Sequence, residues 1–178
     1  MLAAPALLLA PRIDAAFGAT MPRKALAEAI LLLFLGWALS RLTPHWRKPS
    51  YAPAAVTGAT LGLMFWMIPR SIDQTQISFV MNGLYVYSLL VAGFLLSHFW
   101  PLLSGVVKVA TALYASSMIV GIGLLYASLS TLLCSAFTLE DQHAFGRMIV
   151  ALGLFLYVLA LASMMRWLKA PVAGATGE

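Results

Sequence analysis

Long apolar stretches with almost no charge dominate this sequence, and they constrain its fold more than any other feature. Only 10% of the 178 residues are charged, whereas a typical soluble domain carries about 25%. So few charges cannot coat a water-facing surface, and they lie mostly between the apolar stretches, as in membrane proteins. The sequence therefore predicts an integral membrane protein rather than a soluble enzyme.

Five stretches are candidate spans, because a membrane-crossing helix needs roughly 20 mainly apolar residues. Lipid offers no hydrogen bonds to an open backbone, so each stretch is expected to be helical. The predicted fold class is all-α, a polytopic transmembrane helix bundle within residues 25–168. The fourth stretch is longer than one span needs and is expected to tilt or to extend past the lipid. The predicted spans are Ala25–Leu42, Pro53–Pro69, Ile77–Phe99, Leu102–Phe137 and Gly146–Leu168.

The two ends of the chain are expected to lie outside the bundle. Residues 1–24 are interpreted as an apolar remnant followed by a basic linker. Within them, Met1–Ala10 is too short to span and contains a proline, which favours a short membrane-dipping segment, with a cleaved signal peptide as the alternative. Residues 169–178 are small and polar, which predicts a disordered tail.

Loop charges give a weak indication of topology. The segments 11–24, 70–76 and 135–145 are expected on one face, called side A, and the opposite helix ends on side B. Side B carries six lysines and arginines and side A carries five, so we expect side B to be cytoplasmic, together with the C-terminus. The expected location is a bacterial or archaeal cytoplasmic membrane. Three tryptophans would form an aromatic belt on side B: Trp46, Trp100 and Trp167.

Gly58 and Gly62 form a GxxxG step in the second span. Small residues let the backbones of two membrane helices approach closely, so this step predicts a helix-packing face. The neighbouring helix could belong to this chain or to a partner.

Several soft ligands occur towards the side-A ends of the spans. Thioether, thiolate and imidazole groups suit Cu(I), and their convergence would make a copper site, although methionine is also a common packing residue. The candidate ligands are Met64, Met67, Cys134, His143 and Met148. Copper is the one cofactor that the sequence suggests, and none is certain.

Other polar residues indicate little chemistry. Glu28 and Lys108 lie near the membrane edges and are expected to snorkel. The mid-membrane polar side chains are interpreted as hydrogen-bonding between helices, or, in an alternative reading, as lining a small solute facilitator: Thr57, Thr60, Asn82, Ser88, Ser116 and Ser117.

Catalysis and haem binding have weak support. The segment with Glu140, Asp141 and His143 is interpreted as a solvated loop before the last helix. A bis-histidine haem would need His45 and His98 at matching depth, whereas His98 alone fits an interfacial position at a helix end. The single cysteine excludes an internal disulfide, and no nucleic-acid-binding pattern is present.

Several short motifs follow one another over residues 60–168: Phe65-Trp66-Met67-Ile68-Pro69, then Ser88-Leu89-Leu90-Val91-Ala92-Gly93 with Phe99-Trp100-Pro101-Leu102-Leu103, then Leu139-Glu140-Asp141-Gln142, Gly146-Arg147-Met148-Ile149 and Arg166-Trp167-Leu168. Their order resembles that in the CtaG-like cytochrome c oxidase assembly proteins. The family's histidines are replaced, with Met67 at one position and Val86 or Tyr87 at another.

The resemblance implies an accessory integral membrane protein of a copper-dependent haem-copper oxidase, acting as an assembly factor or as a non-catalytic subunit. Its partners would be other membrane subunits of a respiratory complex. The alternatives from the sequence are a purely structural subunit of another membrane complex and a small solute facilitator.

Overall fold

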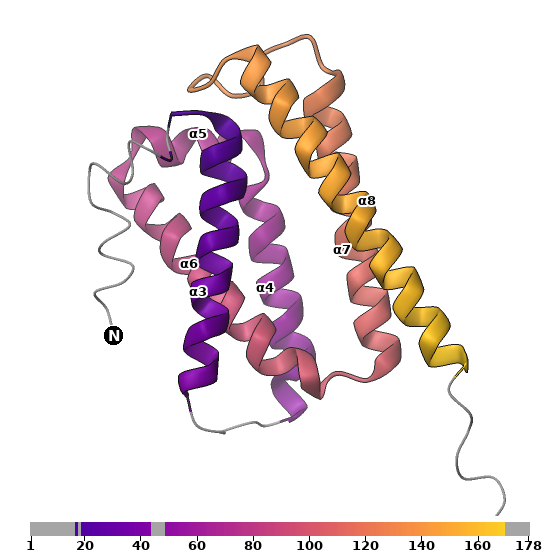
Figure 1. The fold of residues 1–178 in the computed structure, drawn as a ribbon. Coiled ribbons are helices and arrows are strands. Elements are labelled where there is room, and N and C mark those ends of the chain that lie inside the picture. The colour runs from indigo at the N-terminus through magenta and orange to yellow at the C-terminus, as the bar shows by residue number, and fades with distance from the viewer. Residues whose placement is uncertain (1–16, 18, 44–48, 170–178) are drawn as a thin grey trace, which may run out of the picture.

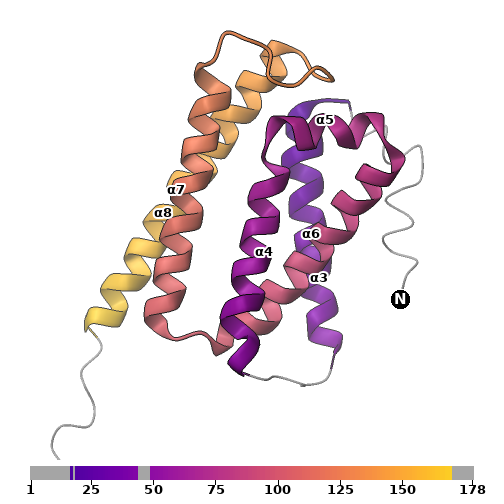
Figure 2. The ribbon, with the colours of Figure 1, turned by 180° about the vertical axis from the view of Figure 1, so that it is seen from behind.

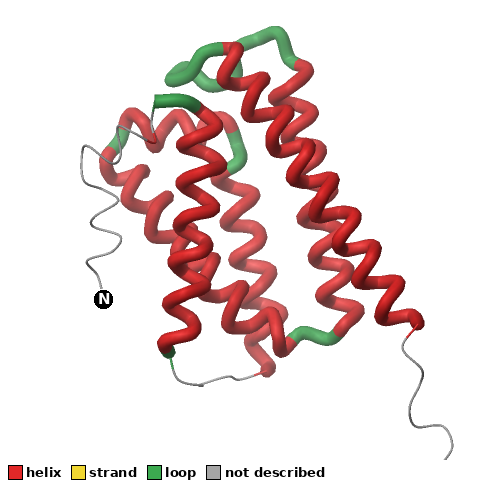
Figure 3. Tube along the Cα trace, in the orientation of Figure 1, coloured by secondary structure: helices red, strands yellow, loops and turns green. Residues whose placement is uncertain are grey.

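The computed structural model describes residue 17 and residues 19–43 and 49–169. The segment Met1–Ala10, the tail from residue 170 and the side chains of His45, Trp46 and Trp167 lie outside the described part. Every regular element within that part is a helix, as Figure 3 shows. Four helices there are long and apolar enough to cross a membrane, and a bent helix pair makes a fifth if it is counted as one span, which confirms the predicted all-α bundle.

The first span begins before the predicted start at Ala25. A π-helix, η1 (Arg23–Glu28), leads directly into α3 (Ala29–Leu42). Lys24, assigned to the basic linker from the sequence, is therefore part of the membrane helix. Because π-helical turns are rare and often mark functional sites, the polar contacts of η1 are described below.

The second span is broken. A short turn, η2 (Pro49–Tyr51), precedes α4 (Ala52–Trp66), whose 15 residues cover only about 22 Å of a hydrocarbon core about 30 Å thick. The chain then bends by 73° into α5 (Pro69–Ile77). The expectation of a loop over 70–76 was wrong, because Pro69 occupies the first turn of a helix, where its missing N–H costs nothing.

The third span, α6 (Phe79–Phe99), starts at Ser78, whose hydroxyl accepts a hydrogen bond from the Met81 amide. The turn η3 (Trp100–Leu102) connects α6 to α7 (Gly105–Ser128), which Ser104 caps in the same way. The fourth span therefore ends at Ser128 and not at Phe137, so it is a single crossing followed by an irregular loop.

The last helix, α8 (Leu139–Lys169), begins seven residues before the predicted Gly146. The reason is a cap at Thr138, whose hydroxyl accepts from the Asp141 amide and donates to the Asp141 carboxylate. Glu140, Asp141 and His143 thus belong to the first turns of α8, and the solvated loop expected there was wrong.

The helices form two parts (Figures 1 and 2). In the first, α3, α4 and α6 pack together, with α5 lying across their side-A ends. In the second, α7 and α8 form an antiparallel hairpin packed along its length. In each part, two helices approach closely at a glycine. A Cβ on Gly36 of α3 would clash with the Leu90 carbonyl of α6, and a Cβ on Gly146 of α8 would lie 2.5 Å from the Ala127 amide of α7. Glycine is what permits both close approaches.

Candidate functional site

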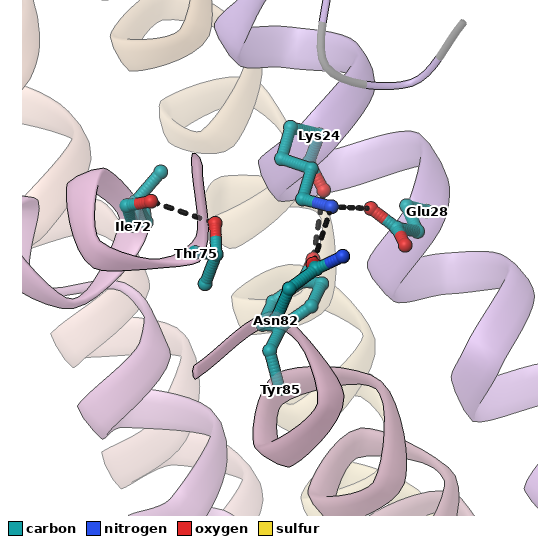
Figure 4. A network of polar contacts seen from close by, with 6 residues as sticks. All are labelled: Lys24, Glu28, Ile72, Thr75, Asn82 and Tyr85. Carbon is teal, nitrogen blue, oxygen red and sulfur yellow. Dashed lines mark hydrogen bonds and ion pairs between the residues drawn. The ribbon is translucent and has the colours of Figure 1, made fainter. Parts of the chain in front are cut away.

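A buried polar network connects η1 to α6 near side A (Figure 4). The Lys24 ammonium lies 3.0 Å from the Glu28 carboxylate and donates a 2.7 Å hydrogen bond to the Asn82 side-chain oxygen. The Tyr85 hydroxyl donates to the Lys24 backbone carbonyl over 2.7 Å, and the ammonium lies 5.4 Å from the centre of the Tyr85 ring. These contacts fix the first span against the third.

The charged and polar residues of this network are almost completely buried. The exposed fractions are 1% for Lys24, 0% for Glu28 and 3% for Asn82. The prediction that Glu28 snorkels to the membrane edge was therefore wrong, because its charge is neutralised locally by the lysine one turn away. A buried ion pair is weak evidence for stability by itself, but ionisable residues inside membrane helices mark functional positions by default.

The bend between α4 and α5 is covered by the second part of the molecule. The Tyr126 hydroxyl of α7 donates to the Met67 carbonyl over 3.0 Å, and the Cys134 thiol contacts the Pro69 carbonyl at 3.5 Å. Carbonyl groups at a break in a membrane helix need such partners, because lipid supplies none. Within α5, the Thr75 hydroxyl donates to the Ile72 carbonyl, as Figure 4 shows.

Asp73 of α5 holds the loop that connects α7 to α8. Its carboxylate accepts hydrogen bonds from the Ser135 amide at 2.7 Å, the Ser135 hydroxyl at 3.0 Å and the Ala136 amide at 3.1 Å. At the other end of the same loop, buried Gln142 accepts from the Leu133 amide and donates to the Thr131 carbonyl. The two parts of the molecule are thus joined by specific polar contacts on side A.

The environment of Cys134 keeps its thiol protonated. Burial, together with the negative charge of Asp73, raises the pKa of the Cys134 thiol to about 11, although a hydrogen bond with Tyr126 acts in the opposite direction. The thiolate is the form that attacks electrophiles and binds metals, so binding of Cu(I) by Cys134 would have to release the thiol proton.

The five candidate copper ligands are only partly brought together. Met64, Met67 and Cys134 all belong to or pack against one apolar cluster beneath α5. His143 instead has its Nε2 atom 2.9 Å from the Leu129 carbonyl, and the Met148 side chain is 48% exposed. Among the described residues, no three His, Cys, Asp or Glu side chains form a metal-binding group. Copper binding stays a prediction, with the three sulfur residues as its core.

The Gly58–Gly62 step does not pack against the described part of this chain. A Cβ on either glycine would meet nothing within 4 Å, so the helix face predicted for packing has no neighbour among the described residues. The close crossings use other glycines, Gly36 with Gly93 between α3 and α6, and Gly123, Gly146 and Gly153 between α7 and α8. Sequence spacing identified a face suited to packing but could not tell which helix would cover it.

A cavity of about 580 Å³ separates the two parts of the molecule. It extends between α3, α4 and α6 on one side and α7 and α8 on the other, and its lining is almost wholly apolar. The cavity is partly open at the surface of the bundle, so molecules of the surrounding membrane can enter it.

The hydroxyl groups in the cavity wall offer little to a polar solute. Thr60, Ser116 and Ser163 each donate to a carbonyl of their own helix, over 2.7–2.8 Å. Ser116 and Thr60 were expected to bond between helices or to line a water path, and they satisfy their own backbone instead. The cavity therefore favours hydrocarbon over water.

His98 lies in the last turn of α6, at the helix end where the sequence placed it. It is 1% exposed, and its ring centroid lies 5.4 Å from that of Phe94, on which it stacks, and 5.0 Å from that of Phe99, which it meets edge-on. His45, the second residue of the haem alternative, lies outside the described part of the chain.

Sequence reasoning missed Lys24 and Gln142 as structural centres. Gln142 could have been placed through the Thr138-x-x-Asp141 spacing, which is a capping signature and would have put it inside a helix. Nothing in the sequence indicated that Lys24 would be buried, because a basic residue before an apolar stretch normally faces the headgroups.

Neither a protein-family model, nor a curated protein, nor a solved structure matches this chain. The likeness to CtaG-like proteins therefore remains an expectation from the quoted motifs, and the functional argument depends on the geometry.

Proposed function

We propose that this protein is an accessory, non-catalytic integral membrane protein that binds laterally to another membrane protein. The observation that carries the proposal is the open face of α4 around Gly58 and Gly62. Elsewhere in the described part of the chain, close helix contacts are made at glycines, whereas this GxxxG pair has no neighbour there. In lipid, such a face associates with another helix through close van der Waals packing.

The candidate partner is a copper-dependent haem-copper oxidase, which this protein would serve as an assembly factor or as a bound subunit. The resemblance of residues 60–168 to CtaG-like proteins supports this choice. The location would be a bacterial or archaeal cytoplasmic membrane, with the C-terminus on the cytoplasmic side. A structural subunit of another complex is the alternative, and the apolar cavity wall argues against a solute facilitator.

Association is tested with leucine substitutions at open glycines. Gly58→Leu with Gly62→Leu should remove co-migration with partner subunits in a native gel of mildly solubilised membranes. Gly121→Leu is the matched control, because Gly121 of α7 also has open space around it and lies outside the proposed face. A lone monomer in the unsubstituted protein, or a complex unaffected by the α4 substitutions, would reject the proposal.

Transient Cu(I) handling is a second candidate function, favoured by the shared cluster of Met64, Met67 and Cys134. The purified protein loaded with Cu(I) should retain near-stoichiometric metal, and Met67→Leu combined with Cys134→Ser should lose it. Met148→Leu serves as the control, because this exposed side chain lies outside the cluster. Equal metal retention in the double variant and the parent would exclude the copper function and leave lateral association untouched.

A further inference from the structure

The cavity between the two parts of the molecule has the shape of a slot along the helices. Along α6 and η3 its lining runs from Tyr85 to Trp100, which corresponds to about 22 Å at 1.5 Å per residue. One leaflet of a bilayer has a hydrocarbon depth of about 15 Å. The slot is therefore longer than one leaflet is deep, and it lies along the spans.

The volume of the cavity suits a small-molecule ligand. Its 580 Å³ lies within the range of about 300–1,000 Å³ that is usual for such sites. A flexible hydrocarbon chain of a lipid fits a slot of this size and shape.

The residues at the side-B end of the slot indicate how such a chain would be oriented. The slot reaches Trp100 and Ser163 at its side-B end, and tryptophan is typical of the membrane interface. Lys108 lies beside this end, since its ammonium donates to the Pro101 carbonyl over 3.2 Å. Exposed Arg166 is one turn beyond Ser163. Two cations thus flank the end where a lipid phosphate would lie.

We infer that the cavity binds an acyl chain of a membrane phospholipid, with the phosphate headgroup at the side-B end near Lys108. The wall is almost wholly apolar and disfavours water, the hydroxyls of Thr60, Ser116 and Ser163 donate to carbonyls of their own helices, and the surrounding bilayer contains phospholipid. The bound lipid fills the space between the α3–α4–α6 part and the α7–α8 hairpin. This inference does not depend on the proposed partner or on copper.

Trp66 reports on the interior of the cavity, because it lines the slot and is only 7% exposed. The test uses a protein in which Trp37, Trp46, Trp100 and Trp167 are replaced by phenylalanine. It is reconstituted in phosphatidylcholine vesicles with or without bromine on the acyl chains, which quenches tryptophan on close contact. Trp66 emission should be strongly quenched by the brominated lipid.

Filling the slot should remove this quenching. Ala115→Phe and Ala112→Phe place a ring in the cavity from α7, whereas Ala151→Phe places one on an exposed position of α8 as the matched control. The inference is supported if quenching is lost in both folded filled variants and kept in the control. Quenching that persists in a folded filled variant would overturn the inference. A second protein that keeps only Trp37, which is 41% exposed, is the positive control for quenching. If Trp37 is quenched there while Trp66 in the parent is not, the inference is also overturned.

Native mass spectrometry of the parent protein released from native membranes gives a second measurement that needs no substitution. A retained adduct with the mass of a phospholipid supports the inference. A bare protein, or an adduct with the mass of an isoprenoid quinone, would contradict it.

Discussion

The Lys24 ammonium and the Asn82 side-chain oxygen lie 2.7 Å apart although the two residues are 58 positions apart in the chain. This contact joins the π-helical start of the first span to the third span, below the break between α4 and α5. Together with Glu28 it brings two opposite charges into a site that is closed to solvent. The first prediction concerns the energetic coupling of that pair.

Removing one charge of the pair should cost far more than removing both. Glu28→Leu leaves the Lys24 ammonium buried without its counter-charge, which is expected to destabilise the protein by about 3–5 kcal/mol. Lys24→Met should have a similar effect, whereas the double substitution should restore most of the loss. Reversible unfolding in mixed micelles measures all four free energies, and additive losses would show that the two charges do not interact.

Glycines with close neighbours should respond differently from open ones. Gly36→Ala places a methyl group against the α6 backbone and should lower the unfolding free energy and separate α3 from α6. Gly58→Ala has open space and should be neutral, or stabilising by about 0.5–1 kcal/mol through reduced backbone entropy. The same micelle titration compares the two variants, and equal effects would contradict the assignment of packed and open faces.

Asp73 is expected to control the order of the loop between α7 and α8. Asp73→Ala removes the acceptor for the Ser135 and Ala136 amides, so these amides should exchange faster with deuterium. Glu140→Ala is the control, because Glu140 is an exposed acid at the start of α8. Unchanged exchange over residues 129–138 in the Asp73 variant would argue against this role.

The reaction of Cys134 with iodoacetamide should depend on pH in a shifted range. Because burial and Asp73 raise the pKa of the thiol to about 11, alkylation should be slow near neutrality and should rise steeply only as the pH approaches 11. Asp73→Asn removes one cause of the shift and should move the profile to lower pH. A profile centred on the ordinary cysteine pKa would contradict the buried environment.

The raised pKa of the Cys134 thiol also makes the folding stability depend on pH. The protonated thiol is the form that the folded state prefers, so its contribution is fully present below the ordinary pKa and is lost as the pH rises through about 11. Cys134→Ser should lack this alkaline loss, which thermal unfolding between neutral pH and pH 11 would show as a flatter profile.

The sequence by itself determined that this protein lies in lipid and that its regular elements are helices. Stretches such as Phe79–Phe99 carry no ionic side chain apart from a histidine, and a backbone in lipid must satisfy its own hydrogen bonds. These two facts were sufficient to predict an all-α membrane bundle. The signals for capping at Thr138 and for a helix start at Pro69 were also present in the sequence, and reading them would have placed α5 and the start of α8.

Only the tertiary structure decided which faces meet. A GxxxG step is equally suited to an internal or an external neighbour, so the sequence could not show that Gly36 and Gly93 are packed while Gly58 and Gly62 are open. From the sequence, Lys24 would be expected to face the headgroups. Only the packing of α6 shows that Asn82 lies against it. The cavity, likewise, results from how the α7–α8 hairpin diverges from the other helices, because its wall consists of apolar residues that could equally have packed against one another.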